Sequence, residues 1–184
     1  MDKNPLIAKL NKAVPDAVLE SRRFGRSGIT SIWLEAESIV KVAKFLKSDE
    51  DLKLDWLENL SLVEFEEVLV ATYFVTSSTT PQNVILRISA IPTSPLDHIY
   101  FPSIRSIWPM AEPMEREAAD LFGVIFKKDS DTSTLEESES KSNFLPENWI
   151  GFPLRKGYVF PKEVYGLAHS RIGKKDFQKK VVPR

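Results

Sequence analysis

The chain has 184 residues, enough for one domain with tails, and its 42% hydrophobic and 28% charged residues are typical of globular proteins. It contains no cysteine, which excludes disulfides, cysteine-ligated iron–sulfur clusters and thiolate zinc sites within the chain. The net charge of −1 argues against overall attraction to nucleic acid. We expect neither a secretory signal nor a transmembrane helix, because no apolar run is long enough.

The first part of the chain alternates between helical and strand patterns. Residues 5–14 carry apolar side chains at helical spacing, which predicts a short amphipathic helix. Residues 17–24 and 29–34 suit two strands of a hairpin, since glycines at both ends of 25–28 favour a turn. Residues 37–47 predict a second helix, with lysines on its solvent side.

The middle of the chain indicates a sheet followed by an irregular region. Two runs rich in β-branched and aromatic residues, 62–76 and 83–91, flank the turn residues 77–81, so we expect them to pair as antiparallel strands. Arg87 in the second run would point from the open face of this sheet, into solvent or against a partner. Residues 92–113 hold five of the twelve prolines, which argues against a long helix or central strand.

The densest motif is the string MEREAADLFGV, Met114–Val124, which reads as a short amphipathic helix. Glu112 is suited to cap this helix, with Pro113 at the first helical position. Glu115 would then complement the helix dipole in the first turn. Gly123 is suited to end the helix in a left-handed conformation.

The acidic side chains of this helix leave three interpretations open. Glu115, Glu117 and Asp120 could hold a divalent metal in a stand-alone enzyme, although Glu115 and Glu117 are two residues apart and face different directions. Arg116 lies four residues before Asp120 and can pair with it. The other interpretations are an ordinary solvated helix and a charged face that docks on a partner through arginine bridges.

The C-terminal third contains three kinds of segment. Residues 129–140 hold five acids and no base, as expected of a solvated loop. Residues 144–161 interleave aromatics with prolines, so they are expected to lie extended across a surface. Residues 171–184 carry six basic residues against one acid, which leaves a binder of nucleic acid or anionic membranes as an alternative. His98 and His169 stand in no metal or catalytic motif.

Several runs of the chain together resemble one known family. The first comprises Glu115, Arg116, Glu117, Asp120, Leu121, Phe122, Gly123, Val124 and Phe126. A second comprises Trp149, Pro153, Leu154, Arg155, Lys156 and Tyr158, and shorter matches lie within 55–64 and 101–109. These positions resemble the motifs of the C subunit, also called the 30 kDa subunit, of respiratory complex I, the proton-translocating NADH:quinone oxidoreductase. The likeness spans residues 37–161, with Phe152 and Gly157 where the family usually has histidine and aspartate.

The resemblance implies an α+β fold in which a mixed or antiparallel sheet is packed by helices in one compact two-layer domain. It also implies three parts: a core domain over residues 1–126 that ends in the charged helix, an acidic loop over 127–143, and a partner-wrapping segment with a basic tail over 144–184. Arg116, Glu117 and Asp120 would anchor the charged helix. Phe122 and the Pro153–Lys156 run would fix the extended segment.

The function implied is that of a non-catalytic, cofactor-free subunit that braces the quinone-site D subunit and the cluster-bearing B subunit. NADH, FMN, iron–sulfur clusters and quinone would be bound by partner subunits. The chain would lie peripherally on the cytoplasmic side of the inner membrane. The alternatives are the equivalent subunit of a related membrane-bound hydrogenase or alternative-donor complex, and the stand-alone metal-dependent enzyme that uses Glu115, Glu117 and Asp120.

Overall fold

The computed structural model of the chain describes residues 4–24, 28–66, 68–91, 99–127, 144–146 and 149–160, and the backbone of 163–164 and 167–168. Its helices are α1 (Pro5–Ala13), the 3-10 helix η1 (Ala36–Ser38), α2 (Ile39–Ser48) and α3 (Ala111–Phe122). Its strands are β1 (Val18–Arg23), β2 (Thr30–Leu34), β3 (Trp56–Phe65), β4 (Val68–Thr76), β5 (Asn83–Ala90), β6 (Ile99–Pro102), β7 (Val124–Lys127), β8 (Glu163–Val164) and β9 (Leu167–Ala168). The expected acidic loop, the basic tail and both histidines lie outside the described residues.

A five-stranded mixed sheet forms the centre of the fold, in the order β1-β2-β5-β4-β3. Its neighbouring strands are antiparallel except β2 and β5, which run parallel. The hairpin expected over 17–34 is confirmed, and so is the antiparallel pairing of 83–91 with the strand that ends at Thr76. Two shorter pairs, β6–β7 and β8–β9, stand outside this sheet.

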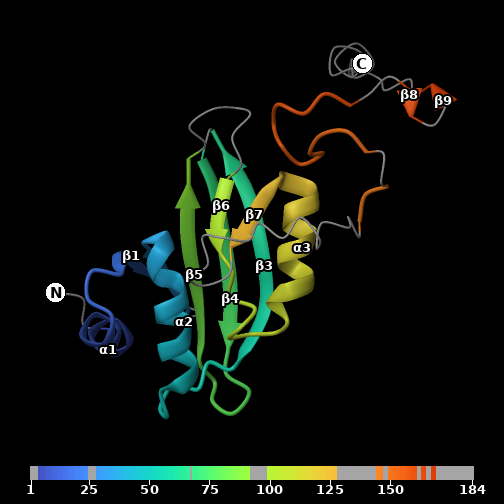
Figure 1. Cartoon of the computed structure of the whole chain (residues 1–184). Coiled ribbons are helices and arrows are strands. Elements are labelled where there is room, and N and C mark those ends of the chain that lie inside the picture. The colour runs from blue at the N-terminus through green and yellow to red at the C-terminus, as the bar shows by residue number, and fades with distance from the viewer. Residues whose placement is uncertain are drawn as a thin grey trace, which may run out of the picture.

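A second layer covers one face of the sheet (Figure 1). Helix α2 and the β6–β7 pair lie over this face, and α3 runs alongside the edge strand β3. Strand β4 shows the resulting alternation, because Leu69, Ala71, Tyr73 and Val75 are buried while the residues between them are half-buried. The expected two-layer α+β architecture is therefore confirmed.

Residues 62–76 do not form one continuous strand. The chain reverses after Phe65, where Glu66 adopts a left-handed conformation with φ of 56°, and the sheet continues in β4. Hairpin turns that need positive φ are usually signalled by glycine or asparagine. Here glutamate takes that conformation, and the apolar run continues on both sides, so the sequence pattern did not reveal the turn.

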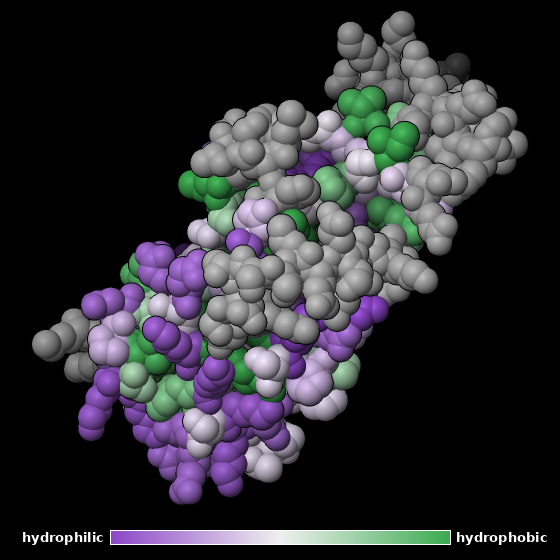
Figure 2. Space-filling model, in the orientation of Figure 1, coloured by the Kyte–Doolittle hydropathy of each residue, from purple (hydrophilic) through white to green (hydrophobic). Residues whose placement is uncertain are grey.

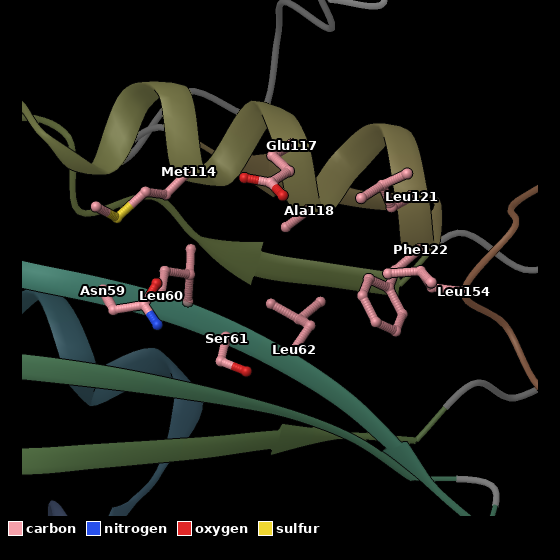
Figure 3. Close-up of a pocket in the computed structure, with 10 residues that line it drawn as sticks. All are labelled: Asn59, Leu60, Ser61, Leu62, Met114, Glu117, Ala118, Leu121, Phe122 and Leu154. Carbon is pink, nitrogen blue, oxygen red and sulfur yellow. The ribbon is translucent and has the colours of Figure 1, made fainter. Parts of the chain in front are cut away.

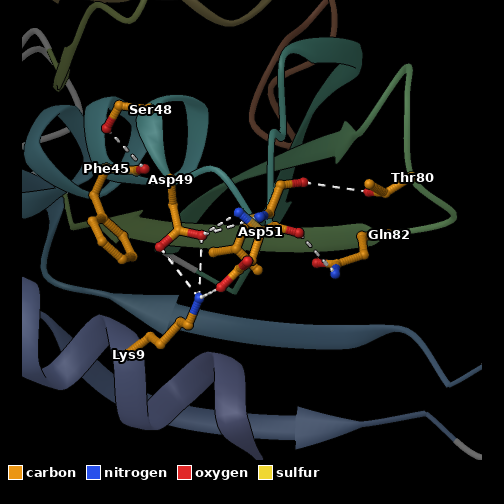
Figure 4. Close-up of polar contacts among 8 residues, drawn as sticks. Lys9, Phe45, Ser48, Asp49, Asp51, Thr80 and Gln82 are labelled. Atoms are coloured by element: carbon orange, nitrogen blue, oxygen red, sulfur yellow. Dashed lines mark hydrogen bonds and ion pairs between the residues drawn. The ribbon is translucent and has the colours of Figure 1, made fainter.

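Polar side-chain contacts cap helix α1 and join it to the end of α2. Helix α1 begins as predicted, with Pro5 in its first turn and the Asn4 side chain accepting the Leu6 N–H at 3.1 Å. At the far end of α2, Asp49 and Asp51 both accept hydrogen bonds from Lys9 of α1 (Figure 4). These bonds connect α1 to the turn that leads from α2 into β3.

The other face of the sheet carries an aromatic–arginine cluster. The Arg87 guanidinium lies 5.6 Å from the ring centroid of Trp33 and 6.0 Å from that of Phe24. Arg87 therefore lies on the face expected from its strand pattern, half-buried by aromatic rings. In the described part of the chain, no helix combines the length and apolarity needed to span a bilayer.

Candidate functional site

Helix α3 carries the charged motif and begins two residues before the predicted Pro113 start. Ala111 is its first residue, so Pro113 is the third, where its missing N–H would have had no helical partner. The predicted cap at Glu112 is therefore wrong, and Glu112 lies inside the first turn. The helix ends as predicted at Gly123, whose φ of 68° and ψ of 34° are left-handed.

Glu115 lies past the first turn and faces the protein interior, with 5% of its surface exposed. Its carboxylate accepts the Ser103 hydroxyl at 2.7 Å and the Ile104 N–H at 2.8 Å, which fixes the end of β6 against α3. Burial nevertheless raises the pKa of Glu115, because these bonds only partly replace the lost hydration. Burial first, and the Glu115 charge second, also raise the pKa of Tyr73. Glu115 is thus a structural core carboxylate, and the expected dipole contact in the first turn is not its role.

The other charged residues of α3 face outward and make different contacts. Arg116 pairs with Glu112 at 2.6 Å, so the expected pair with Asp120 is wrong. Asp120 accepts the backbone N–H of Phe144 at 3.1 Å. The side chain of Glu117 reaches into a hollow between α3 and β3 (Figure 3).

The three carboxylates proposed for a metal therefore point into three different surroundings. Glu115 faces the core, Glu117 faces the hollow, and Asp120 faces Phe144. Among the residues that the structure describes, no group of three or more histidine, aspartate or glutamate side chains is placed to share an ion.

The end of α3 forms a seat for residues 152–156, which we call the PLRK segment after its Pro153–Lys156 run. The carbonyl of Leu121 accepts the Leu154 N–H at 3.1 Å, and the carbonyl of Phe122 accepts the Arg155 side chain at 2.8 Å. A Cβ atom on Gly123 would lie 2.3 to 2.5 Å from ring carbons of Phe152. Glycine is therefore required at position 123 for two reasons: its backbone is left-handed, and the Phe152 ring packs where a side chain would lie.

A glutamate on β3 holds the other side of the PLRK segment. Glu64 accepts the Lys156 N–H at 2.6 Å and pairs with the Arg155 guanidinium at 3.4 Å. Lys156 in turn lies 5.5 Å from the ring centroid of Phe65. Glu64 lies in a run that matches the family pattern, but no contact was predicted for it from the sequence. Ser103, the partner of Glu115, was likewise part of a matched run with no assigned role.

Three aromatic residues flank the PLRK segment, Trp149 before it and Tyr158 and Phe160 after it. The rings of Trp149 and Phe160 meet edge to face with centroids 5.6 Å apart. The Tyr158 ring packs on Gly151, where an added Cβ would approach it to 2.9 Å. The Trp149 N–H and the Tyr158 hydroxyl are buried and have no hydrogen-bond partner among the described residues. Trp149 and Tyr158 thus shape the segment by ring packing.

Residues 149–160, which we call the C-terminal segment, are held through hydrogen bonds at residues 154–156, and several of their apolar side chains are exposed. Ile150 is 81% exposed, Val159 85%, Leu154 51% and Phe152 40%. In Figure 2, apolar colour gathers over this segment at the upper right, while the surface around the lower end of α2 is mainly polar. Residues 150–159 thus expose four large apolar side chains within a short stretch of chain.

Comparison with known proteins agrees with this arrangement. A family model described as "Respiratory-chain NADH dehydrogenase, 30 Kd subunit" matches residues 32–164. The chain is 34% identical to the C subunit of NADH-quinone oxidoreductase from Roseiflexus sp. (strain RS-1), over 85% of this chain and 83% of that protein. It is 26% identical to the C/D subunit of NADH-quinone oxidoreductase from Buchnera aphidicola, over 83% of this chain and 25% of that protein.

A solved structure shares the fold. A chain of the membrane-bound sulfane sulfur reductase, an archaeal respiratory membrane complex, superposes with a TM-score of 0.56 at 18% identity, over 72% of this chain and 74% of that one. This likeness concerns the fold alone. The family match covers most of this chain, including β3, α3 and the PLRK segment. The chain therefore belongs to the 30 kDa subunit family of respiratory-chain NADH dehydrogenases.

Proposed function

We propose that the chain is a non-catalytic, cofactor-free subunit of a proton-translocating NADH:quinone oxidoreductase, in which it braces the subunits that carry the redox centres. NADH, FMN, iron–sulfur clusters and quinone would all be bound by those partners. In this proposal the chain lies peripherally on the cytoplasmic side of the inner membrane.

One observation carries the proposal: the C-terminal segment is held by its backbone while its apolar side chains remain exposed. Burying a large aliphatic side chain contributes about 1.5–3 kcal/mol, which a free chain forgoes at Ile150 and Val159. The bonds to Leu121, Phe122 and Glu64 hold residues 154–156, which lie in the chain between these two exposed side chains. A preformed apolar strip on a fixed backbone is suited to binding a partner without a large ordering cost.

Two partners follow from the family. We place the quinone-site D subunit against the C-terminal segment and the cluster-bearing B subunit nearby. The Buchnera relative supports the first assignment, because its name joins C and D in one protein. The related membrane-bound hydrogenase or alternative-donor complex is the competing assignment, and the identity of the co-purified subunits separates the two.

The test is purification of the tagged full-length chain from native membranes. We expect it to bring down the other peripheral-arm subunits, and we expect the chain alone to show no NADH:quinone turnover. Replacing Ile150 and Val159 together with asparagine should deplete those subunits, whereas the control Leu19→Asn, at a 59% exposed apolar residue of β1, should not. Unaided turnover by the chain, or a fully built and active enzyme in cells that lack it, would overturn the proposal.

A further inference from the structure

The hollow between α3 and β3 has the shape of an open slot, whose lining combines apolar side chains with the polar side chains of Asn59, Ser61 and Glu117. It measures about 210 Å³, and Figure 3 shows the Leu60 and Leu62 side chains turned from β3 toward the helix. Ala118 and Phe122 line it from α3, and Leu154 of the PLRK segment lines it as well. Three parts of the chain that are far apart in sequence therefore build this one slot.

The size of the slot indicates what kind of group it can hold. Its volume is several times the ~30 Å³ that a water molecule occupies in the liquid. It is below the roughly 300–1,000 Å³ of pockets that bind small molecules and cofactors. A single long side chain from another protein fits these dimensions better than a free ligand.

The charged group of the slot is the carboxylate of Glu117, an exposed residue of α3. Glu117 makes no hydrogen bond or ion pair in the described part of the chain. The neighbouring carboxylates are already engaged, because Glu112 pairs with Arg116 and Glu64 pairs with Arg155. Glu117 therefore places a carboxylate, unpaired among the described residues, beside Leu60 and Leu62, an arrangement that favours a cationic guest with an aliphatic stem.

The adjacent strand adds hydrogen-bond acceptors. Strand β3 is the edge of the sheet and pairs only with β4 within it. In an edge strand, every second residue points its backbone N–H and C=O away from the sheet. A cationic group in the slot would thus meet the Glu117 carboxylate on the helix side and the polar side chains of Asn59 and Ser61 on the strand side.

We propose that this slot receives an arginine side chain from a partner subunit. Its aliphatic stem would lie against Leu60 and Leu62, and its guanidinium would bond Glu117 and the edge of β3. Arginine fits better than lysine, since its planar fork of five donors can satisfy acceptors on two sides. This inference rests on the proposed function, because it needs a partner chain.

The location of the partner is tested by photo-crosslinking in the assembled complex. p-Benzoylphenylalanine would be introduced at Asn59, an exposed β3 residue at the lining of the slot, and as a control at Lys41, an exposed position on α2. We expect light to join position 59, and not position 41, to a partner peptide that contains an arginine. A complex that assembles but crosslinks at position 59 to a peptide without arginine, or not at all, overturns the inference and leaves the proposed function standing.

The role of the Glu117 charge is tested by measuring the rate at which the labelled chain exchanges out of the purified complex. Glu117→Gln should speed exchange roughly tenfold or more, as expected on removing one member of a buried charge pair. The matched control Glu58→Gln removes an exposed carboxylate of β3 that does not line the slot, and should leave the rate unchanged. Glu117→Arg combined with glutamate at the crosslinked arginine should restore the slow rate.

Two results would contradict the charge pair. If Glu117→Gln and Glu58→Gln exchange at the same rate, the slot holds no paired cation. If the charge-swapped pair stays as fast as Glu117→Arg alone, the crosslinked arginine is not the guest. If the chain enters no membrane complex at all, the proposed function fails, and this inference fails with it.

Discussion

The sheet core and the C-terminal segment use apolar side chains in opposite ways. In the core, polar groups such as Glu115 are buried with their own partners, and the aliphatic side chains of β4 are sealed beneath α2, β6 and β7. In residues 149–160, backbone and polar bonds hold the chain in place, while Ile150 and Val159 face outward. The core therefore buries its own apolar side chains, whereas residues 149–160 leave apolar side chains exposed on a surface suited to a partner protein.

The largest difference between the two regions is expected in the loss of stability when one aliphatic side chain in each region is shortened to alanine. Leu69→Ala, at a fully buried position of β4, should lower the free energy of unfolding by about 2–5 kcal/mol. Ile150→Ala, at an 81% exposed position, should change it by less than about 0.5 kcal/mol. Urea unfolding of the isolated chain measures both. Similar losses for the two variants would mean that the segment belongs to the folded core.

The junction between the two regions is tested at Gly123. Gly123→Ala should cost about 1–3 kcal/mol, because alanine is strained at φ of 68° and its Cβ would meet the Phe152 ring. The control is Gly157→Ala, where an added Cβ meets nothing within 4 Å. Adding Phe152→Ala to Gly123→Ala should recover the part of the loss that is due to the ring. Equal unfolding midpoints for the two glycine variants would refute this account of the seat.

The contribution of the buried Glu115 carboxylate to the free energy of unfolding should depend on pH. Because burial raises the Glu115 pKa above its ordinary 4.5, the stability linked to this group is complete below the unfolded pKa and is lost as the pH rises through the folded pKa. Glutamine does not titrate, so the stability of Glu115→Gln relative to the native chain should be greatest near neutral pH. It should fall as the pH is lowered toward 4.5. A pH-independent difference would show that Glu115 is not desolvated.

A small effect on global stability is expected where the core holds the segment. Glu64→Gln weakens the contacts to Arg155 and the Lys156 N–H, which should cost about 1 kcal/mol, since the glutamine oxygen still accepts the Lys156 N–H. Amide hydrogen exchange of residues 154–156 should nevertheless become several-fold faster, while that of β4 stays unchanged. Glu58→Gln is the control on the same strand. Unchanged exchange in 154–156 would mean that Glu64 does not hold the segment.

The sequence predicted those features that depend on periodicity and on local backbone chemistry. The start of α1 at Pro5, the β1–β2 hairpin, the pairing of β4 with β5 and the left-handed end of α3 at Gly123 all follow from residues close in sequence. The turn at Glu66 was missed because glutamate rarely takes positive φ.

The features of the site that sequence could not predict depend on long-range contacts. From the sequence alone, Glu115 is expected to be a surface carboxylate. In the structure it is buried against Ser103 and Ile104, the two residues that follow β6. Glu64 holds Lys156 across 92 positions of sequence, a contact that no local pattern reveals. Arg116 could pair equally well one turn in either direction, and only the structure shows that it pairs with Glu112.

The most direct test of the central claim is hydroxyl-radical footprinting of the same full-length chain, free in solution and within the complex purified from native membranes. Ile150 and Val159 should be oxidised readily in the free chain and several-fold more slowly in the complex, whereas Leu19, an exposed apolar residue of β1, should react at the same rate in both. Equal oxidation of Ile150 and Val159 in the free and assembled states would show that no partner covers the segment, and would contradict the claim that this chain acts as a brace.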